Sequence, residues 1–209
     1  MKRHRIVALA VTGVAASLVV GTLVIGSNMG FKKNQPLTAA NQDQWVAVPF
    51  TGPYANADDL LNLVLGGDGT ITRFIPGIPT GFDFWNGSSG NNFAFVPGEA
   101  YQFRPGSTSG GTSAIIVGAH DPNQTIPVGG FTTGVDYLVS PPYHTTATNA
   151  DDLLADLPGL ATVTRLIPGP TSAFDFWTGS AGYNFAYTIG DGVLIRPATS
   201  SAGYLPAHF

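Results

Sequence analysis

The sequence predicts a mainly β fold of the α+β class, in which two tandem homologous units follow an N-terminal hydrophobic leader helix. Three observations support this. Two motifs recur at a nearly constant spacing, Gly and Pro are abundant (27 and 16 residues), and only 11% of the 209 residues are charged. Soluble domains ordinarily have about 25% charged residues, so Ser, Thr, Asn, Gln and Gly must supply most of the polar surface. We expect each unit to hold about six short strands and one short helix, in a sandwich-like or barrel-like arrangement.

The first residues, 1–30, are predicted to direct export. Lys2, Arg3 and Arg5 precede an uncharged apolar run at 6–26, and polar residues follow. This order is typical of a secretory signal peptide. Because the run is also long enough to span a bilayer, a retained N-terminal membrane anchor is the alternative. We expect a secreted protein in the extracellular space or at the cell surface, with the periplasm also open, and contact with a membrane only through this segment if it is uncleaved.

The distribution of charge argues against nucleic acid as a partner. Five of the nine basic residues lie at or before Lys33, whereas all thirteen acidic residues lie after it. The remainder of the chain therefore carries four arginines, no lysine and a formal charge of −9. Such a chain lacks the cations that must neutralise a phosphate backbone.

An internal duplication organises the rest of the chain. The sequence Asn-Ala-Asp-Asp-Leu-Leu occurs at 56–61 and again at 149–154, and Phe-Asp-Phe-Trp occurs at 82–85 and again at 174–177. Such self-similarity indicates repeated structural units. The aligned copies place a linker at 31–42, the first unit at 43–123, a second linker at 124–135 and the second unit at 136–209.

Each unit is expected to begin with a short apolar strand, at 44–50 and 137–141, because each run ends at a proline that cannot donate to a β-ladder. A helix should follow. Asn56 and Asn149 are suitable N-caps, and the aspartates of the first turn face the positive end of the helix dipole. Leucines then continue at helical spacing, and Gly66 ends the first helix.

Two more strands are expected in each unit after the helix. Residues 70–75 and 162–167 alternate β-branched and apolar side chains before a Pro-Gly turn. The aromatic motif at 82–85, with its copy at 174–177, is predicted to be a short strand that a glycine-containing turn closes.

A hairpin and a last strand complete the predicted unit. Phe93 and Phe95 are expected to pair with Tyr101 and Phe103 around the Pro97-Gly98 turn, where the glycine allows a positive φ angle. Residues 114–118, and 203–206 in the second unit, are expected to form the closing strand.

The Phe-Asp-Phe-Trp motif is a candidate binding site. Alternation along a strand places its two phenylalanines on one face and Asp83 and Trp85 on the other. If they face solvent, Asp83 and Trp85, with Asp175 and Trp177 in the second unit, are suited to hold a glycan through ring stacking and hydrogen bonds to hydroxyl groups. If they face a second layer, they belong to the core, and the usual burial of tryptophan favours this interpretation.

The basic residues after position 33 form two matching pairs: Arg73 with Arg165, and Arg104 with Arg196. We expect these arginines to pair with Asp83 and Asp175, or with carbonyl groups, inside each unit. Recognition of an anion by the planar guanidinium group is the alternative.

No motif points to a cofactor, a metal or catalysis. The glycine-rich turn at 66–69 lacks the Lys-Ser/Thr of a P-loop, and the aspartate pairs lack the spacing of a calcium loop. No Gly-x-Ser-x-Gly nucleophile motif is present. His120 and His208 fall in separate units, so they are not expected to share a metal ion. We therefore predict no catalytic residue, no metal site and no cofactor.

Four stretches resemble a largely uncharacterised group of secreted bacterial proteins that carry tandem copies of this unit. They are Asn-Met-Gly-Phe-Lys at 28–32, Asn-Ala-Asp-Asp-Leu-Leu at 56–61, Asn-Phe-x-x-x-Pro-Gly-Glu-x-Tyr at 92–101 and Pro-Ala-His at 206–208. The resemblance covers nearly the whole chain. It implies export from a bacterium of the Gram-negative type and a surface or extracellular place, but it brings no established activity. The second unit departs from the pattern with Ile189-Gly190 in place of Pro-Gly.

These observations favour an exported, non-enzymatic structural or interaction protein of the bacterial cell surface or extracellular space. Low charge, β-rich units and duplication would allow self-association through exposed strand edges. The first alternative is a carbohydrate-binding module that holds a glycan with Trp85 and Trp177. The second is a secreted enzyme whose catalytic cluster lies in one unit or between the two.

Overall fold

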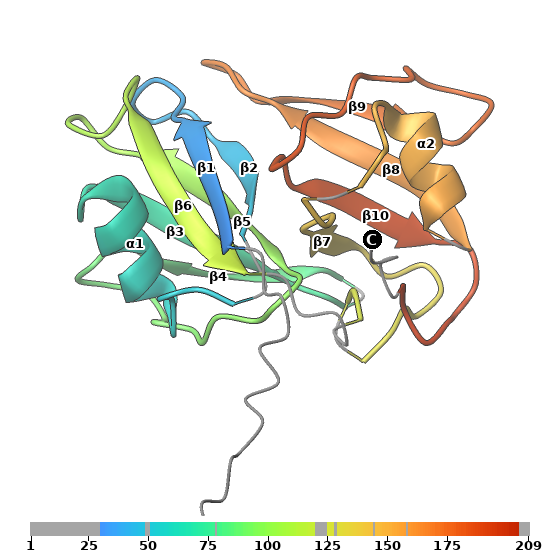
Figure 1. Cartoon of the computed structure of the whole chain (residues 1–209), viewed down its shortest axis with the longest axis horizontal. Coiled ribbons are helices and arrows are strands. Elements are labelled where there is room, and N and C mark those ends of the chain that lie inside the picture. The colour runs from blue at the N-terminus through green and yellow to red at the C-terminus, as the bar shows by residue number, and fades with distance from the viewer. Residues whose placement is uncertain are drawn as a thin grey trace, which may run out of the picture.

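The structure is a computed structural model that describes residues 30–48, 51–77, 79–119, 125–127, 129–143, 145–157 and 159–204. Two lobes lie side by side, each with a twisted sheet and one short helix (Figure 1). The predicted mainly β fold is confirmed, with open antiparallel sheets and not a closed barrel. The predicted leader lies outside the described residues except for Gly30. In the described ranges, no helix is long and apolar enough to cross a membrane.

A four-stranded antiparallel sheet forms the centre of the first unit. Its strands are β2 (Gln44–Ala47), β5 (Ala100–Pro105), β3 (Gly69–Ile75) and β4 (Gly81–Trp85), in that spatial order. The helix α1 (Ala57–Leu65) covers one face of this sheet. The strands β1 (Gly30–Pro36) and β6 (Ser113–Ala119) pair antiparallel and cover the same face beside the helix.

The strand β1 lies in the segment 31–42 that the sequence assigned to a linker. It pairs with β6 along its whole length, from Gly30 opposite Ala119 to Pro36 opposite Ser113. The run Lys-Lys-Asn-Gln inside β1 has no apolar alternation, so sequence pattern gave no sign of the strand. The pairing itself, which joins segments far apart in the chain, makes it a strand.

The second unit repeats the four-stranded sheet. Its strands are β7 (Tyr137–Val139), β10 (Val193–Pro197), β8 (Leu160–Ile167) and β9 (Ala173–Trp177), in the same spatial order as their counterparts. The helix α2 (Ala150–Asp156) packs against β8. In the place of the β1–β6 ribbon, isolated bridges join Ile126 to Tyr204 and Phe131 to Ser201.

Both helices begin at the predicted asparagines. The Asn56 side chain accepts a hydrogen bond from the Asp59 amide at 3.1 Å, and the Asp59 carboxylate accepts from the Asn56 amide, which completes a capping box. Asn149 accepts from the amides of Asp151 and Asp152. The first helix ends at Gly66, whose φ of 64° is a left-handed conformation that glycine adopts without strain.

The predicted hairpin that pairs Phe93 and Phe95 with Tyr101 and Phe103 is wrong. β5 lies between β2 and β3 and pairs with both of them, not with the segment at 93–95. The segment before the turn instead runs past the start of α1, where the Ala57 amide donates to the Phe93 carbonyl at 2.9 Å. The first amides of a helix have no partner inside the helix, and this segment supplies one.

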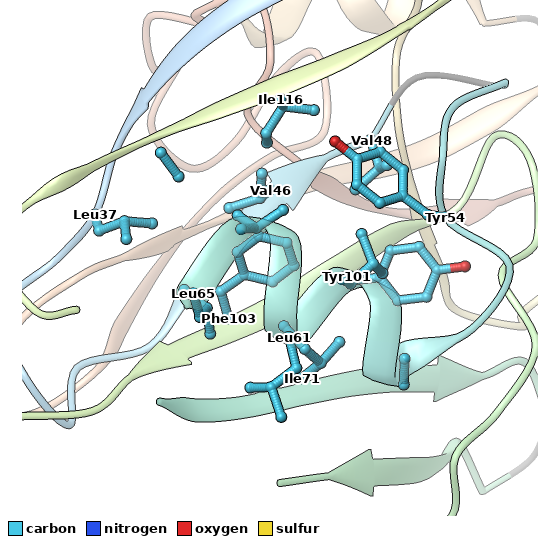
Figure 2. Close-up of a cluster of buried hydrophobic side chains, with 14 of the residues drawn as sticks. Leu37, Val46, Val48, Tyr54, Leu61, Leu65, Ile71, Tyr101, Phe103 and Ile116 are labelled. Atoms are coloured by element: carbon cyan, nitrogen blue, oxygen red, sulfur yellow. The ribbon is translucent and has the colours of Figure 1, made fainter. Parts of the chain in front are cut away.

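Each unit has its own hydrophobic core between its sheet and its helix. In the first unit, Leu61, Ile71, Tyr101 and Phe103 are almost completely buried where the layers meet (Figure 2). The second core is built in the same way around Val163, Phe185 and Ile195.

The two units contact each other in a nearly symmetric way. The Ala47 amide donates to the Gly190 carbonyl at 2.9 Å, and the equivalent Ser140 amide donates to the Gly98 carbonyl at 2.9 Å. Each bond joins the edge strand of one unit, β2 or β7, to the turn that precedes β10 or β5 of the other. We call the apolar cluster beneath these bonds the inter-unit contact; it consists of Trp45, Phe74, Ala100, Leu138, Leu166 and Leu194.

Candidate binding faces of the two sheets

The predicted tryptophans lie on the helix side of their sheets. The Trp85 ring packs partly against the first core, and its Nε1 donates to Asp58 Oδ1 at the start of α1 at 2.9 Å. In the second unit, Trp177 Nε1 donates to Asp151 Oδ1 at the same distance of 2.9 Å. Both indoles therefore tie strand to helix, as the core interpretation of the motif requires, and their only N–H donors already have partners.

The predicted pairing with the motif aspartates is confirmed for Arg73 and Arg165, whereas Arg104 and Arg196 bind Asp43 and Asp136 instead. Arg73 Nη2 lies 3.0 Å from Asp83 Oδ2, and Arg165 Nη2 lies 2.7 Å from Asp175 Oδ2. The Arg73 guanidinium also lies over the Phe93 ring, 5.0 Å from its centroid. Arg73 and Asp83 therefore bind each other, whereas the Trp85 side chain binds Asp58 of the helix.

The residues that sequence reasoning missed are the two phenylalanines of the same motif. Phe82 and Phe84 are 69% and 45% exposed, and Phe174 and Phe176 in the second unit are 59% and 49% exposed. Strand alternation does place them opposite the aspartate and tryptophan, so the signal was present. Phenylalanine is usually a core residue, so the exposure of these side chains was not expected.

These phenylalanines lie on what we call the open face, the face of each sheet that points away from its helix. In the first unit the open face carries Thr70, Thr72, Phe82 and Phe84, and they line a groove of about 480 Å³. The second unit has a groove of about 270 Å³ in the matching place. Its lining repeats the pattern with Thr162, Thr164, Phe174 and Phe176.

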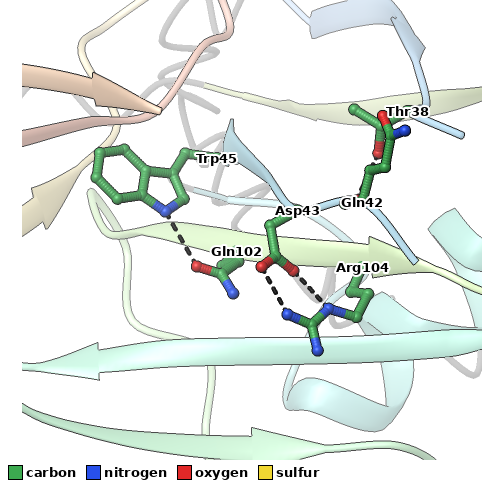
Figure 3. A network of polar contacts seen from close by, with 6 residues as sticks. All are labelled: Thr38, Gln42, Asp43, Trp45, Gln102 and Arg104. Atoms are coloured by element: carbon green, nitrogen blue, oxygen red, sulfur yellow. Dashed lines mark hydrogen bonds and ion pairs between the residues drawn. The ribbon is translucent and has the colours of Figure 1, made fainter. Parts of the chain in front are cut away.

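An arginine held by an aspartate closes one end of each groove. Arg104 donates from Nε and Nη2 to the two carboxylate oxygens of Asp43, each at 2.6 Å (Figure 3). This hydrogen bonding raises the pKa of Arg104. Arg196 and Asp136 form the same bidentate pair at 2.8 and 2.6 Å. Since both bonds of Arg104 use Nε and Nη2, its Nη1 keeps its donors for another partner.

The two open faces are joined through Trp45. Its ring lies 5.8 Å from Phe74, which lines the first groove, and 5.7 Å from Phe174, which lines the second. Its Nε1 donates to Gln102 Oε1 at 3.2 Å, which holds the ring over β5 (Figure 3). The exposed phenylalanines of the second unit are therefore continuous with the inter-unit contact.

The open faces combine apolar and polar groups. They offer aromatic rings, threonine hydroxyls and one arginine each, a combination that buries apolar area and fixes orientation with a few hydrogen bonds. Within the described ranges, no three His, Asp or Glu side chains gather as a metal site. No family model, curated protein or solved structure matches the chain.

Proposed function

We propose that this chain is an exported, non-enzymatic interaction protein that associates with further copies of itself through the open faces of its two units. The observation that carries the proposal is the pair of exposed phenylalanines on each open face, which recurs at matching positions of the two sheets. Export rests on the predicted leader, and the surface or extracellular location rests on the resemblance stated above.

The free phenylalanines belong to edge strands. β4 and β9 are the last strands of their sheets. The turn that follows each strand pairs with the end of its outer edge, where the Asn91 and Tyr183 amides donate to the Phe84 and Phe176 carbonyls at 2.8 and 2.9 Å. The rest of each outer edge has no strand partner within the described sheets. An exposed apolar edge strand is a template for pairing with another chain. Face and edge together therefore suit an extended contact with a second copy.

The contact between the two units of one chain supports the choice of the open faces as the surface for such a partner. There, one open face already packs on another, because Trp45 of the first unit contacts Phe174 of the second. Phe174 remains more than half exposed after this contact. A second copy would extend an existing apolar contact and would not need to begin a new one.

The expected strength of this association is modest. Fully burying an exposed phenylalanine side chain contributes about 1.5–3 kcal/mol. The four phenylalanines are already about half buried, so the eight rings of two copies together supply roughly 6–12 kcal/mol. Association costs on the order of 4–15 kcal/mol in lost freedom of motion. We therefore expect self-association at micromolar or higher concentration, strengthened where a leader or a surface concentrates the protein.

The test is the mass of the full chain in solution over a wide range of concentration, by size-exclusion chromatography with light scattering. The wild-type mass should rise with concentration. The double variants Phe82→Thr/Phe84→Thr and Phe174→Thr/Phe176→Thr should shift this rise to higher concentration, because threonine keeps the strand and removes the ring.

The matched control is Leu63→Thr on α1, which removes a side chain that is 55% exposed on the opposite side of the first sheet. It should leave the association unchanged. A wild-type protein that stays monomeric at every concentration, or an association that both phenylalanine variants leave intact, would overturn the proposal.

A further inference from the structure

The grooves of the two open faces are built from the same residue types at matching positions. These residues line a groove or pair with the arginine at its end. In the first unit they are Asp43, Thr70, Thr72, Phe82, Phe84 and Arg104. The same amino acids stand at 136, 162, 164, 174, 176 and 196 of the second unit. Each chain therefore presents one set of groups twice.

The remaining positions of the open faces differ between the units, and they take part in the inter-unit contact. In the first unit they are Trp45, Ala47, Phe74, Ala100 and Gln102, and in the second they are Leu138, Ser140, Leu166, Gly192 and Leu194. Most belong to the apolar cluster of that contact, and the others bond to it or pack on it. These differences follow from the contact itself, because side chains that face each other must compensate in size.

The contacts within the chain do not account for the repeated phenylalanines in the same way. All four rings, two on each open face, are at least 45% exposed. A ring that stays in water adds little to the stability of the fold, and grouped exposed apolar side chains mark interaction sites. The same rings are exposed in both units, which indicates that the two grooves make the same kind of contact.

The groups on one open face can satisfy a second copy of that face. Threonine hydroxyls both donate and accept hydrogen bonds, and Nη1 of Arg104 and of Arg196 keeps its donors. Each arginine is balanced by the aspartate that it binds, so two such faces bring no unpaired like charges together. The face also carries both protruding rings and a groove, which makes it complementary to itself.

The two grooves differ in size although their chemistry is shared. The first has a volume of about 480 Å³ and the second about 270 Å³. Trp45 of the first unit lies against Phe174 of the second groove, with their ring centroids 5.7 Å apart. Its counterpart in the second unit, Leu138, is a smaller side chain. We therefore expect the same contact at both faces, with weaker binding at the second.

We propose that each chain has two equivalent binding faces, that the partner of an open face is an open face of another copy, and that copies join into a linear chain. This inference rests on the proposed self-association and specifies its partner and valency. A contact between two open faces uses one face of each copy and leaves the other face of each copy free. The free face at either end binds a further copy, so growth does not stop at a dimer.

The test compares the full chain with one-face variants, in which one pair of phenylalanines is replaced. Phe174→Thr/Phe176→Thr keeps the first face, and Phe82→Thr/Phe84→Thr keeps the second. In sedimentation velocity at rising concentration, the wild-type mass should pass that of two chains. Each one-face variant should approach the mass of two chains without passing it, and the variant that keeps the first face should do so at lower concentration. The variant with all four changes should stay monomeric.

A mixing experiment tests the valency directly. A one-face variant binds the end of an assembly and offers no face for the next copy. Added to wild type in equal amount, it should lower the sedimentation coefficient of the largest assemblies, and the variant with all four changes should leave that coefficient unchanged. Ile115→Thr is the matched control, because Ile115 is a 53% exposed strand residue on β6, outside both open faces. It should assemble as the wild type does, and circular dichroism should show all variants folded.

The results that overturn this inference differ from those that overturn the self-association. A wild type that associates but stops at two chains contradicts two equivalent faces. So do one-face variants that pass two chains, or that stay monomeric where the wild type passes two chains. One-face variants that associate only when mixed with each other show a contact between unlike faces. In these cases the self-association stands, whereas a wild type that stays monomeric overturns both proposals.

Discussion

Gly192 lies so close to Ala100, across the inter-unit contact, that a β-carbon on Gly192 would stand 2.6 Å from the Ala100 β-carbon. It would also stand 3.2 Å from the β-carbon of Trp45. Ala100 and Gly192 occupy matching positions of the duplicated units, and both lie at the inter-unit contact. One copy carries alanine opposite Leu138 and the other carries glycine opposite the larger Trp45, so the sizes of the facing residues compensate.

This packing predicts that Gly192→Ala separates or strains the units. We expect a loss of about 1–3 kcal/mol in the free energy of unfolding, because the clash is with β-carbons that cannot rotate away. Urea unfolding measures it. Adding Ala100→Gly should restore most of the loss, since it removes the closest atom.

The matched control is Gly81→Ala, since Ala173 holds this place in the second unit. A β-carbon on Gly81 would meet only ordinary contacts, the nearest 3.6 Å away on Ile75. It should change stability by less than about 1 kcal/mol. Equal effects of Gly192→Ala and Gly81→Ala would show that the inter-unit contact is looser than described.

Glu99 predicts a pH-dependent stability. It lies in the turn that bridges to Val139 of the other unit, and burial raises its pKa to about 7, although the Arg73 charge and a hydrogen bond from Tyr101 oppose the shift. Below its unfolded pKa of 4.5 the carboxyl is protonated in both states and costs nothing. Above that value the unfolded chain releases its proton first, so the free energy of unfolding falls until the pH exceeds about 7.

The variant Glu99→Gln should remove this dependence. At pH 4 it should match the wild type, and at pH 8 it should be more stable by roughly 1–3 kcal/mol. Unfolding in urea at several pH values measures the difference. Parallel pH profiles for the two proteins would mean that Glu99 is solvated when the protein is folded.

The bond between Trp85 and Asp58 predicts a local coupling of strand to helix. Asp58→Ala removes the acceptor of the indole N–H and a favourable charge at the helix start, so we expect a loss of about 1–2 kcal/mol. Asp58→Asn keeps an acceptor oxygen and should lose less. Urea unfolding followed by circular dichroism gives the energies, and tryptophan fluorescence should shift to longer wavelength in the alanine variant alone.

The two kinds of Arg–Asp pair should differ in strength. In the Arg73–Asp83 pair both side chains are 22% exposed, whereas Arg104 in the surface pair is 52% exposed. We expect Asp83→Asn to cost about 1–3 kcal/mol, because it leaves a half-buried guanidinium without its counter-ion. Asp43→Asn should cost less than about 1 kcal/mol, and high salt should reduce that cost further. Equal losses of stability in Asp83→Asn and Asp43→Asn would contradict the greater burial of the Arg73–Asp83 pair.

Much of the local structure was predictable because its causes are local. Asn56 and Asn149 cap helices through their own side chains, and Gly66 ends one through its own backbone conformation. The alternation in β3 and β4 fixed which residues share a face, and the pairing of Arg73 with Asp83 followed from two strands that are neighbours in sequence.

The open face could not be predicted from the sequence pattern alone. Alternation placed Phe82 opposite Trp85, but it could not say which of the two faces the helix would cover. The covered face depends on where α1 packs. Asp58 of α1 binds Trp85, so the face of β4 that carries Trp85 lies against the helix. The phenylalanines are exposed because the helix covers the other side.

The sequence by itself determined the duplicated units, their helices with caps, and the strands that pattern or turn residues define. Only the tertiary structure decided that β5 lies between β2 and β3, that residues 30–36 form a strand, and that Gln35 meets Asp191 at one pocket. The reason is that caps and alternation act over a few residues, whereas strand partners and docked units are chosen by the apolar surface that distant segments bury together.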